Sequence, residues 1–584
     1  MDNLEFIANQ YPETELSALE RTYDYIVVGA GTAGCVMANR LSENPNMKVL
    51  LIEAGGIETR AMDIPGLAGA FQDTEGILDK DVLPEPFDPI EIDWGYFTEP
   101  SDTFADGLID NSVLYPRGKV MGGSSTINYM IYTRGNPEDY NRWGYNWTFN
   151  DCHKYFKKAE DYQVDDPSEI NNYFGKNGPM HIESPSYRSE FSSAIIKANE
   201  QFGYKQININ GPNQIGVSRL QRTIKNGYRF STNSAYLISV RDKRPNLHLR
   251  RHSLVTRILI SKLQKIPRAY GVVFHSELTT HTIYAKREVI ICAGAINSPQ
   301  LLMLSGIGPM EHLNELGIPV IKNLPVGDNL QDHIYTGGLQ FLLNQTVYPI
   351  TDFGLWLTDR SGPLSLPALI ETYGFSQPID KIQSIEQLYI TAAMQLKSAQ
   401  TMNMKPSVFE TTYAPFQLDP GFLIFSLLQK PKSRGYLRLR GCDPTLKPKI
   451  YPQYFSHPDD LEIMLNGVKE AINITKQDAL QKFGAKLLPI PIPTCAQHTF
   501  KSDNYWRCHI KSLVATLFHY CGTCKMGDKS DPTTVVDPHL RVHGIDGLRV
   551  CDASIMPEII AGHLNVPTMM IAEKCADDIK ETWF

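Results

Sequence analysis

The chain has 584 residues, of which 42% are hydrophobic, and it carries a formal net charge of −8 with a pI near 6.0. This length exceeds what one compact domain normally holds, so we expect two domains. The negative charge, without a long Lys/Arg cluster, argues against nucleic acid or anionic lipid as a partner, and no apolar run approaches the ~20 residues that cross a bilayer. The sequence therefore predicts a soluble protein that acts on a small molecule.

The N-terminal stretch "MDNLEFIANQ" lacks the basic and apolar regions of a signal peptide. Either the protein is cytosolic or a signal has been removed. Three glycosylation sequons, at Asn146, Asn344 and Asn473, favour the second interpretation and predict a secreted glycoprotein. Ten scattered cysteines do not make a recognisable disulfide framework. The sequence leaves open whether the protein is a monomer or a dimer.

The first predicted unit is a strand, a glycine turn, a helix and a second strand. Residues 24–28 are apolar, the turn is G-A-G-T-A-G over residues 29–34, and "KVLLIEAGG" ends the unit with Glu53, 19 residues after Gly34. Such a unit binds a dinucleotide, because the glycines let a pyrophosphate approach the helix N-terminus and the acid accepts hydrogen bonds from a ribose. The cofactor-binding residues expected in this unit are Gly29, Gly31, Thr32, Ala33, Gly34, Glu53 and Ala54.

Residues 71–100 are rich in acid and proline, with nine Asp or Glu residues from Asp73 to Glu99 against the single Lys80. This composition is typical of an exposed loop. The charges indicate a solvated surface, and a lid over a binding site is the second interpretation.

Two further units contain a strand followed by a helix. In "REVIICAGAINSPQLLMLSGIGP" we expect a helix from about Ser298, with Pro299 in its first turn, where the missing N–H is harmless. In "LRVCDASIMPEIIAGHLNVPTMMIAEKCADDIK" we expect a helix that begins near Pro567. Elements of the cofactor domain therefore lie at both ends and in the middle of the chain, so the two domains must be interleaved.

The stretch "TLFHYCGTCKMG" places His519 just before the pair Cys521 and Cys524. Haem attachment requires the histidine after the second cysteine, which excludes that chemistry. A zinc site, a redox dithiol and a catalytic base with two incidental cysteines remain as alternatives from this stretch alone.

Five ordered motifs together resemble the glucose–methanol–choline (GMC) oxidoreductases, a family of FAD-dependent alcohol oxidases and dehydrogenases. They are the glycine turn with "LIEAGG", "GKVMGGSSTIN", "GAINSPQLLMLSGIG", "HYCGTCKMG" and "CDASIMPEIIAGHLNVPT". The resemblance implies an α/β fold, α+β overall, in which a doubly wound FAD domain is interleaved with a substrate domain built on an antiparallel sheet. The expected FAD-domain segments are residues 20–58, 110–135, 225–335 and 515–584. The expected substrate-domain segments, with the lid loop, are residues 59–109, 136–224 and 336–514.

The same resemblance assigns the site. The histidine of the family's H-x-x-G-T motif is His519, our expected general base, and Cys521 and Cys524 are then incidental, so we expect no metal. His563 stands where the family carries histidine or asparagine and should hydrogen-bond the substrate oxygen. We expect one FAD and no NAD, held non-covalently, because Ile127 stands where some members carry a linking histidine. The remaining expected cofactor residues are Gly122, Gly123, Ser124, Asn128, Met130, Val255, Asp552, Ala553, Asn565, Pro567 and Thr568.

The expected reaction is oxidation of an alcohol to a carbonyl, with the hydroxyl proton taken by a neutral imidazole and a hydride passed to flavin N5. We expect O₂ as the electron acceptor, with release of H₂O₂. The chain resembles arthropod members, which implies a small aryl alcohol or a cyanohydrin as substrate, similar to salicyl alcohol or mandelonitrile. One alternative is a dehydrogenase of sugars or other alcohols with a quinone acceptor. The other is a hydroxynitrile lyase with a structural flavin.

Overall fold

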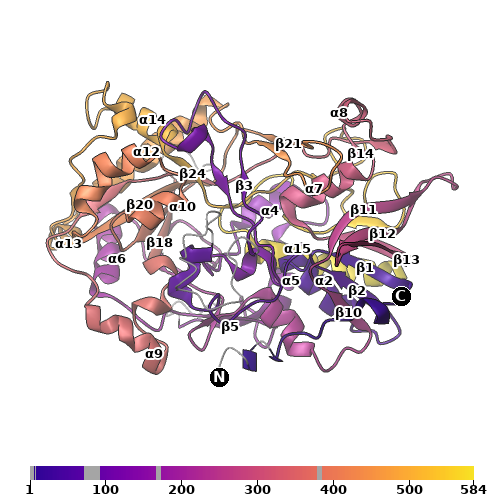
Figure 1. Cartoon of the computed structure of the whole chain (residues 1–584). Coiled ribbons are helices and arrows are strands. Elements are labelled where there is room, and N and C mark those ends of the chain that lie inside the picture. Colours follow the sequence, from indigo (N-terminus) through magenta and orange to yellow (C-terminus); the bar gives the residue numbers. More distant parts are fainter. Residues whose placement is uncertain (1–4, 7, 72–91, 166–171, 378–383, 584) are drawn as a thin grey trace.

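The computed structural model describes residues 5–6, 8–71, 92–165, 172–377 and 384–583. Most of the expected acidic lid loop lies outside these residues. Two sheets lie side by side, each covered by helices (Figure 1). The expected α/β fold is confirmed.

The first sheet is mostly parallel and is drawn on the right of Figure 1. Its strands, in spatial order, are β10 (Leu247–Arg250), β2 (Val49–Ile52), β1 (Thr22–Val28), β13 (Thr279–Ile291), β12 (Arg268–Ser276) and β11 (Leu254–Ser261), with β25 (Leu548–Val550) also on β13. Pairing is parallel among β10, β2, β1, β13 and β25, and antiparallel from β13 to β11. The apolar runs predicted as strands are buried here, as parallel strands covered on both faces must be.

The second sheet is antiparallel and is drawn on the left of Figure 1. Its strands are β23 (Lys486–Leu487), β17 (Gln340–Leu342), β20 (Gly421–Leu428), β19 (Ile385–Ile390), β18 (Ile370–Ser376) and β7 (Gly216–Arg219), with β16 (Ile334–Thr336) between β20 and β24 (Val514–Thr516). Strands β16 and β24 span the expected domain limits at residues 335 and 515. The domain limits themselves stay a prediction.

Helices cover the two sheets. Beside the first sheet, α15 (Asn565–Trp583) packs against α2 (Thr32–Leu41) and α5 (Phe149–Ala159), while α12 (Pro458–Thr475) packs on β20 and against α14 (Asp503–Ser512). Further α-helices in the described part of the chain are α4 (Pro137–Trp143), α6 (Glu190–Phe202), α7 (Gly294–Leu304), α8 (Met310–Glu315), α9 (Leu355–Asp359), α10 (Leu396–Thr401), α11 (Pro406–Val408) and α13 (Asp478–Gln481). Within the described ranges, none of these helices has the length and apolar character needed to cross a membrane.

The expected start of α7 at Ser298 is wrong, because the helix begins at Gly294 and contains Pro299 in its interior. A proline there cannot donate to the carbonyl four residues earlier, which is that of Ala295. The hydroxyl of Thr523 donates to this carbonyl oxygen over 2.6 Å instead. The helix therefore tolerates Pro299 because the H-x-x-G-T motif supplies the missing hydrogen bond.

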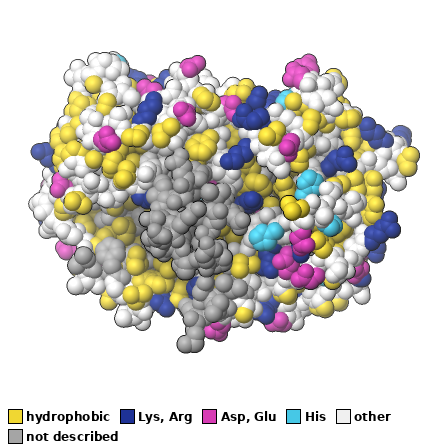
Figure 2. Space-filling view, viewed as in Figure 1, with side chains coloured by type: hydrophobic (Ala, Val, Ile, Leu, Met, Phe, Trp, Pro, Cys, Tyr) yellow, Lys and Arg dark blue, Asp and Glu magenta, His cyan; other side chains and the backbone are white. Residues whose placement is uncertain are grey.

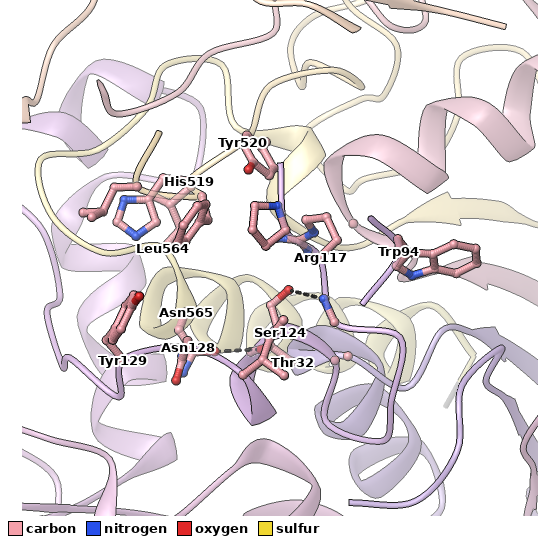
Figure 3. A pocket seen from close by; sticks show the side chains of 18 of the residues that line it. Thr32, Trp94, Arg117, Ser124, Asn128, Tyr129, His519, Tyr520, Leu564 and Asn565 are labelled. Atoms are coloured by element: carbon pink, nitrogen blue, oxygen red, sulfur yellow. Dashed lines mark hydrogen bonds between the residues drawn. The ribbon is translucent and has the colours of Figure 1, made fainter. Parts of the chain in front are cut away.

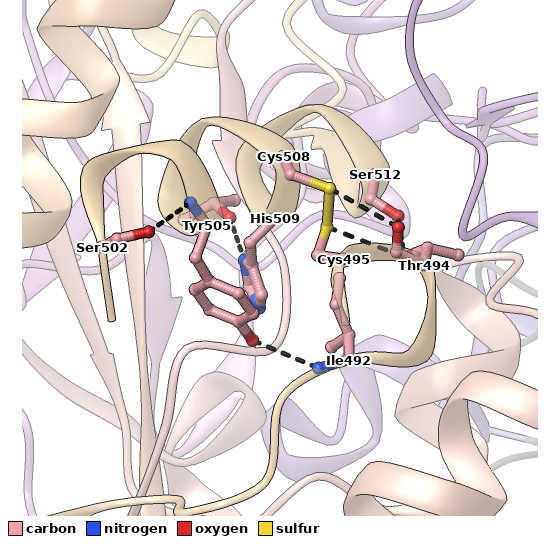
Figure 4. Close-up of a disulfide and its surroundings, with 9 residues drawn as sticks. Ile492, Thr494, Cys495, Ser502, Tyr505, Cys508, His509 and Ser512 are labelled. Atoms are coloured by element: carbon pink, nitrogen blue, oxygen red, sulfur yellow. Dashed lines mark hydrogen bonds between the residues drawn. A yellow bond between two sulfur atoms is a disulfide. The ribbon is translucent and has the colours of Figure 1, made fainter. Parts of the chain in front are cut away.

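One disulfide joins Cys495 to Cys508 and ties α14 to the preceding loop (Figure 4). Cys521 and Cys524 are buried free thiols. On the face shown in Figure 2, acidic and basic side chains are interspersed rather than gathered into one patch of a single sign.

Candidate active site

A cavity of about 490 Å³ runs between the two sheets. One end lies at the carboxyl ends of the parallel strands, where ligands bind in doubly wound folds. The expected residues that line this cavity are Gly29, Gly31, Thr32, Ala33, Glu53, Ala54, Gly123, Ser124, Asn128, Met130, Val255, His519, Asp552, Ala553, His563, Asn565 and Thr568. The remaining three, Gly34, Gly122 and Pro567, are buried close by but do not line it. A Cβ on Gly34 would come within 1.8 Å of the Gly29 oxygen, so this glycine packs α2 against the turn.

The glycine turn and the turn at Gly123 form a narrow cradle made of backbone. A Cβ on Gly123 would lie 2.6 Å from the Gly31 Cα, and Gly123 has a φ of +55°. Gly31 is the N-cap of α2 and makes no side-chain capping bond. The first N–H groups of this helix are therefore available to an anion.

A second helix N-terminus meets the first at the cradle. The hydroxyl of Thr32, at the start of α2, donates to Oδ1 of Asn565, at the start of α15, over 2.7 Å (Figure 3). Helix N-termini carry partial positive charge. Two such ends at one cavity favour an anionic ligand.

Glu53 closes the cradle at the end of β2. Its carboxyl oxygens accept hydrogen bonds from the N–H groups of Ala30 and Gly55, at 2.7 and 2.8 Å. Burial raises the pKa of this carboxyl, which these hydrogen bonds partly offset. Glu53 is thus fixed at the cavity wall with lone pairs left for a ribose diol.

Arg117 is a cavity residue that the sequence analysis did not select. Its guanidinium lies in the centre of the view, between Tyr520 and Ser124 (Figure 3). No salt bridge or side-chain hydrogen bond of Arg117 is found among the described residues, and burial lowers its pKa. The guanidinium lies over the Tyr520 ring, 5.9 Å from its centroid, and is half-buried at the cavity wall. An arginine placed there without an ion pair fits a pyrophosphate, so the cradle residues fit the FAD that the motifs imply. The "PRGK" stretch just before the glycine-rich motif was its only sequence signal.

The loop from Gly122 to Asn128 is fixed from behind by Arg229. This buried guanidinium donates to the main-chain oxygens of Ser125 and Asn128 and to Oδ1 of Asn128. Asn128 faces the cavity together with Tyr129 (Figure 3). Arg229 therefore holds the backbone of the expected flavin-side loop in place.

His519 lies on a bulge of the second sheet. Ile334 pairs with Thr516 and Gln331 pairs with Cys521, so residues 517–520 contain two more residues than the opposite segment has. The main-chain N–H of His519 donates to Oδ1 of Asp332 over 3.0 Å. The bulge pushes His519 out of the ladder and into the cavity.

The imidazole of His519 contacts two other histidines. Its Nδ1 lies 2.9 Å from Nδ1 of His333, and its ring lies 4.8 Å, centroid to centroid, from that of His563. Burial lowers the pKa of His519 well below its ordinary value, and the two histidines lower it further. His519 is therefore neutral at physiological pH, as a general base must be.

His563 is held between the two sheets. Its Nε2 lies 3.1 Å from Oε1 of Glu386, a fully buried carboxyl in β19. The amide of Gln429 donates to the other oxygen of Glu386 and accepts from the N–H of Gly562. The sequence analysis did not identify His333, Glu386 or Gln429. The only local signal for His333 was the polar stretch "NLQDH" over residues 329–333.

Beyond the histidines the cavity is lined mainly by apolar side chains, with Gln395, Lys397, Ser398 and Thr401 as polar lining residues at and just before α10. The rings of Tyr335 and Phe425 stack at 4.1 Å, and Tyr129 and Phe518 complete an aromatic wall. Aliphatic lining residues from the second sheet and the loop before α15 are Ile370, Leu388, Ile390, Leu423 and Leu564. We call this part of the cavity the apolar chamber. It suits a ligand with an apolar body and one polar group at the histidines.

Comparison with known proteins gives matches over nearly the whole chain. Family models described as GMC oxidoreductase match residues 23–335 and 431–572. The chain is 35% identical to the glucose dehydrogenase [FAD, quinone] of Drosophila melanogaster and 37% identical to the mitochondrial choline dehydrogenase of Homo sapiens. These alignments each cover 96% of this chain, and 87% and 90% of the two relatives. The crystal structure of pyridoxine 4-oxidase from Mesorbium loti is 28% identical, with a TM-score of 0.79 over 96% of this chain and 99% of that one.

Proposed function

This chain belongs to the GMC oxidoreductase family and binds FAD, and we propose that it oxidises a small aryl alcohol or cyanohydrin to a carbonyl with O₂ as the electron acceptor. The observation that carries the proposal is the buried imidazole of His519 beside that of His563, next to the apolar chamber. A hydroxyl placed between two imidazoles can lose its proton there, while an aromatic body packs against Tyr335 and Phe425.

His519 takes the hydroxyl proton, since its neutral imidazole lies at the cavity surface and can accept one. His563 hydrogen-bonds the substrate oxygen, and Glu386, which accepts from Nε2, orients that imidazole from behind. FAD, when bound, supplies the hydride acceptor. Gly31, Arg117 and the N-terminus of α15 would hold its pyrophosphate and favour negative charge on the cofactor.

The apolar chamber supports an aryl substrate over a sugar. A sugar carries many hydroxyls, which need polar partners when buried. Among the described lining residues, the charged side chains apart from Lys397 are Glu53, Arg117 and Asp552, and these three lie at the cradle. Apart from the histidines and the tyrosine hydroxyls, the polar partners left for the hydroxyls of a sugar are Gln395, Lys397, Ser398 and Thr401, at and just before α10.

The electron acceptor has one specific rival. The curated relatives include dehydrogenases, one of them named for a quinone, whereas the structural relative cited above is named an oxidase. Rapid formation of H₂O₂ in air with one equivalent of alcohol supports the oxidase. If turnover needs an added quinone and produces no H₂O₂, the electron acceptor is a quinone and not O₂.

One experiment tests the redox function itself. Purified holoenzyme is mixed anaerobically with benzyl-type alcohols and cyanohydrins, and the flavin absorbance is recorded. We expect the yellow flavin band to bleach. A protein that cleaves a cyanohydrin while its flavin stays oxidised would be a hydroxynitrile lyase.

We also propose that FAD is held non-covalently, so that acid precipitation releases it into the supernatant.

We propose further that the protein is secreted and glycosylated. The side chains of Asn146, Asn344 and Asn473 are exposed, and the Cys495–Cys508 disulfide is typical of an oxidising compartment. Endoglycosidase treatment of the protein from its natural source should lower its mass. An unchanged mass would argue for the cytosol.

A further inference from the structure

The catalytic end of the cavity contains a chain of hydrogen bonds that stops at a main-chain carbonyl. Nδ1 of His519 lies 2.9 Å from Nδ1 of His333, and Nε2 of His333 lies 3.1 Å from the main-chain oxygen of Gln429. Burial lowers the pKa of His333 well below its ordinary value, and nearby Lys430 and His563 lower it further. Both His333 and His519 are therefore neutral, with one N–H each.

The carbonyl decides where these hydrogens lie. A carbonyl oxygen only accepts, so Nε2 of His333 must carry its hydrogen and Nδ1 must carry a lone pair. A hydrogen bond between the two Nδ1 atoms then requires the hydrogen to be on Nδ1 of His519. The remaining nitrogen of His519, Nε2, is left with the lone pair that a base needs.

We propose that His333 is a positioning residue which, anchored on the Gln429 carbonyl, holds His519 in the tautomer whose Nε2 is free to take the substrate proton. This inference rests on the proposed function of His519 as the base. Without the contact to His333, neutral His519 would divide between two tautomers, and only one of them could accept a proton at Nε2.

The fold explains why the chain ends on a carbonyl. Ile334 pairs with Leu428 in the second sheet, so His333 and Gln429 stand opposite each other one step beyond the last pair. The main-chain oxygen of His333 also accepts from the N–H of Leu517. His333 and the bulge that carries His519 are therefore placed by the same ladder, and their side chains meet with little freedom.

The side chain of Gln429 provides an internal control. Its amide orients Glu386 against His563 and does not contact His333, which uses only the carbonyl of Gln429. A substitution of the Gln429 side chain should therefore disturb the branch at His563 and leave the tautomer of His519 unchanged. Substitution of His333 should do the reverse.

The test measures the tautomer directly in the ¹⁵N-histidine-labelled holoenzyme. Nitrogen chemical shifts distinguish a protonated from a bare ring nitrogen, and the signals missing from His519→Asn identify His519. We expect Nδ1–H and a bare Nε2 in the wild type. His333→Phe should give a mixture of tautomers, whereas His333→Gln, whose amide oxygen can accept from Nδ1–H, should restore the wild-type shifts. Gln429→Leu should leave them as they are.

Anaerobic flavin reduction gives the second readout. For His333→Phe we expect a rate roughly 10–10³-fold lower, since a wrong tautomer in other enzymes costs up to about 10⁴. The KM should change little, and His333→Gln should recover most of the rate. A hydrogen on Nε2 of wild-type His519, or unchanged shifts in His333→Phe, would overturn the proposal. Suppose that His519→Asn keeps the full rate of flavin reduction while His519 shows the expected tautomers in the wild type and in the His333 variants. In that case His519 would not be the base, but His333 would still set its tautomer.

Discussion

The two ends of the cavity are built in different ways. The cradle is made of backbone, with two glycine turns in contact and two helix N-termini joined by Thr32 and Asn565. The catalytic end is made of side chains, with His519, His333 and Glu386 on strands and loops of the second sheet and His563 on the loop before α15. Backbone recognises the shape and charge of a large cofactor, while side chains control where single protons lie.

This difference determines which substitutions matter at each end. In the cradle, any added side chain is harmful because the turns are already in contact. At the catalytic end, a side chain can be replaced by another of similar shape, and the loss then measures its chemistry. The experiments below use this contrast, in order of decreasing expected effect.

The largest effect should come from removing the base. For His519→Asn we expect flavin reduction to slow by roughly 10²–10⁴-fold, the usual range for a lost general base. Stopped-flow reduction under anaerobic conditions measures it, with FAD content checked for each preparation. A rate within a factor of three of the wild type would place the base elsewhere.

The buried histidines should make stability depend on pH. Burial lowers the pKa of His509 in α14 to about 4, so this group is neutral when folded but gains a proton on unfolding below its ordinary value near 6.5. The stability that comes from keeping His509 neutral is thus fully present above pH 6.5. As the pH falls toward 4, the free energy of unfolding decreases by about 1.4 kcal/mol per pH unit, or about 3 kcal/mol in all.

Urea unfolding of the holoenzyme at several pH values measures this slope. Between pH 6.5 and 4 we expect the free energy of unfolding to fall less steeply in His509→Gln than in the wild type. His498→Gln is the matched control, because it also removes one histidine. An identical slope in His509→Gln would mean that this imidazole is protonated in the folded state.

In the cradle, Gly123→Ala should weaken cofactor binding. Its Cβ would stand 2.6 Å from Gly31, so the turns must separate, and we expect the Kd for FAD to rise by roughly 30-fold, about 2 kcal/mol. The control is Gly317→Ala, at a φ of +69° with open space around it, which carries the same backbone strain of about 1 kcal/mol without the clash. Titration of apoprotein with FAD compares the two variants. Equal affinities would show that close contact of the turns is not needed.

The smallest effect should be that of His563→Asn. The amide can also hydrogen-bond the substrate oxygen, although Glu386 loses its imidazole partner, so we expect a loss of about ten-fold, or 1.4 kcal/mol, in flavin reduction. Stopped-flow rates for this variant and for His519→Asn are compared at equal FAD content. If His563→Asn proved the more damaging, the roles of the two histidines would be reversed or shared.

The sequence predicted the cradle better than the catalytic end, for a physical reason. The unit from β1 to Glu53 is continuous in the chain, so its glycine spacing and apolar strands are visible locally. His333, Glu386 and Gln429 come from separate strands, and their meeting depends on the pairing of β16, β19 and β20. No local pattern encodes such pairing. The start of α7 at Gly294 could not be predicted for the same reason, because Thr523, whose hydroxyl makes Pro299 tolerable, is distant in the chain.

The bond from Thr523 to the carbonyl released by Pro299 makes two remote positions thermodynamically coupled. A residue with an N–H at position 299 would donate to the Ala295 carbonyl itself and make the Thr523 hydroxyl redundant. Conversely, Val in place of Thr523 leaves a buried carbonyl unsatisfied only while Pro299 is present. A mutational library that varies only position 299 or only position 523 will therefore measure an effect that depends on the residue at the other position. The two positions should be randomised together.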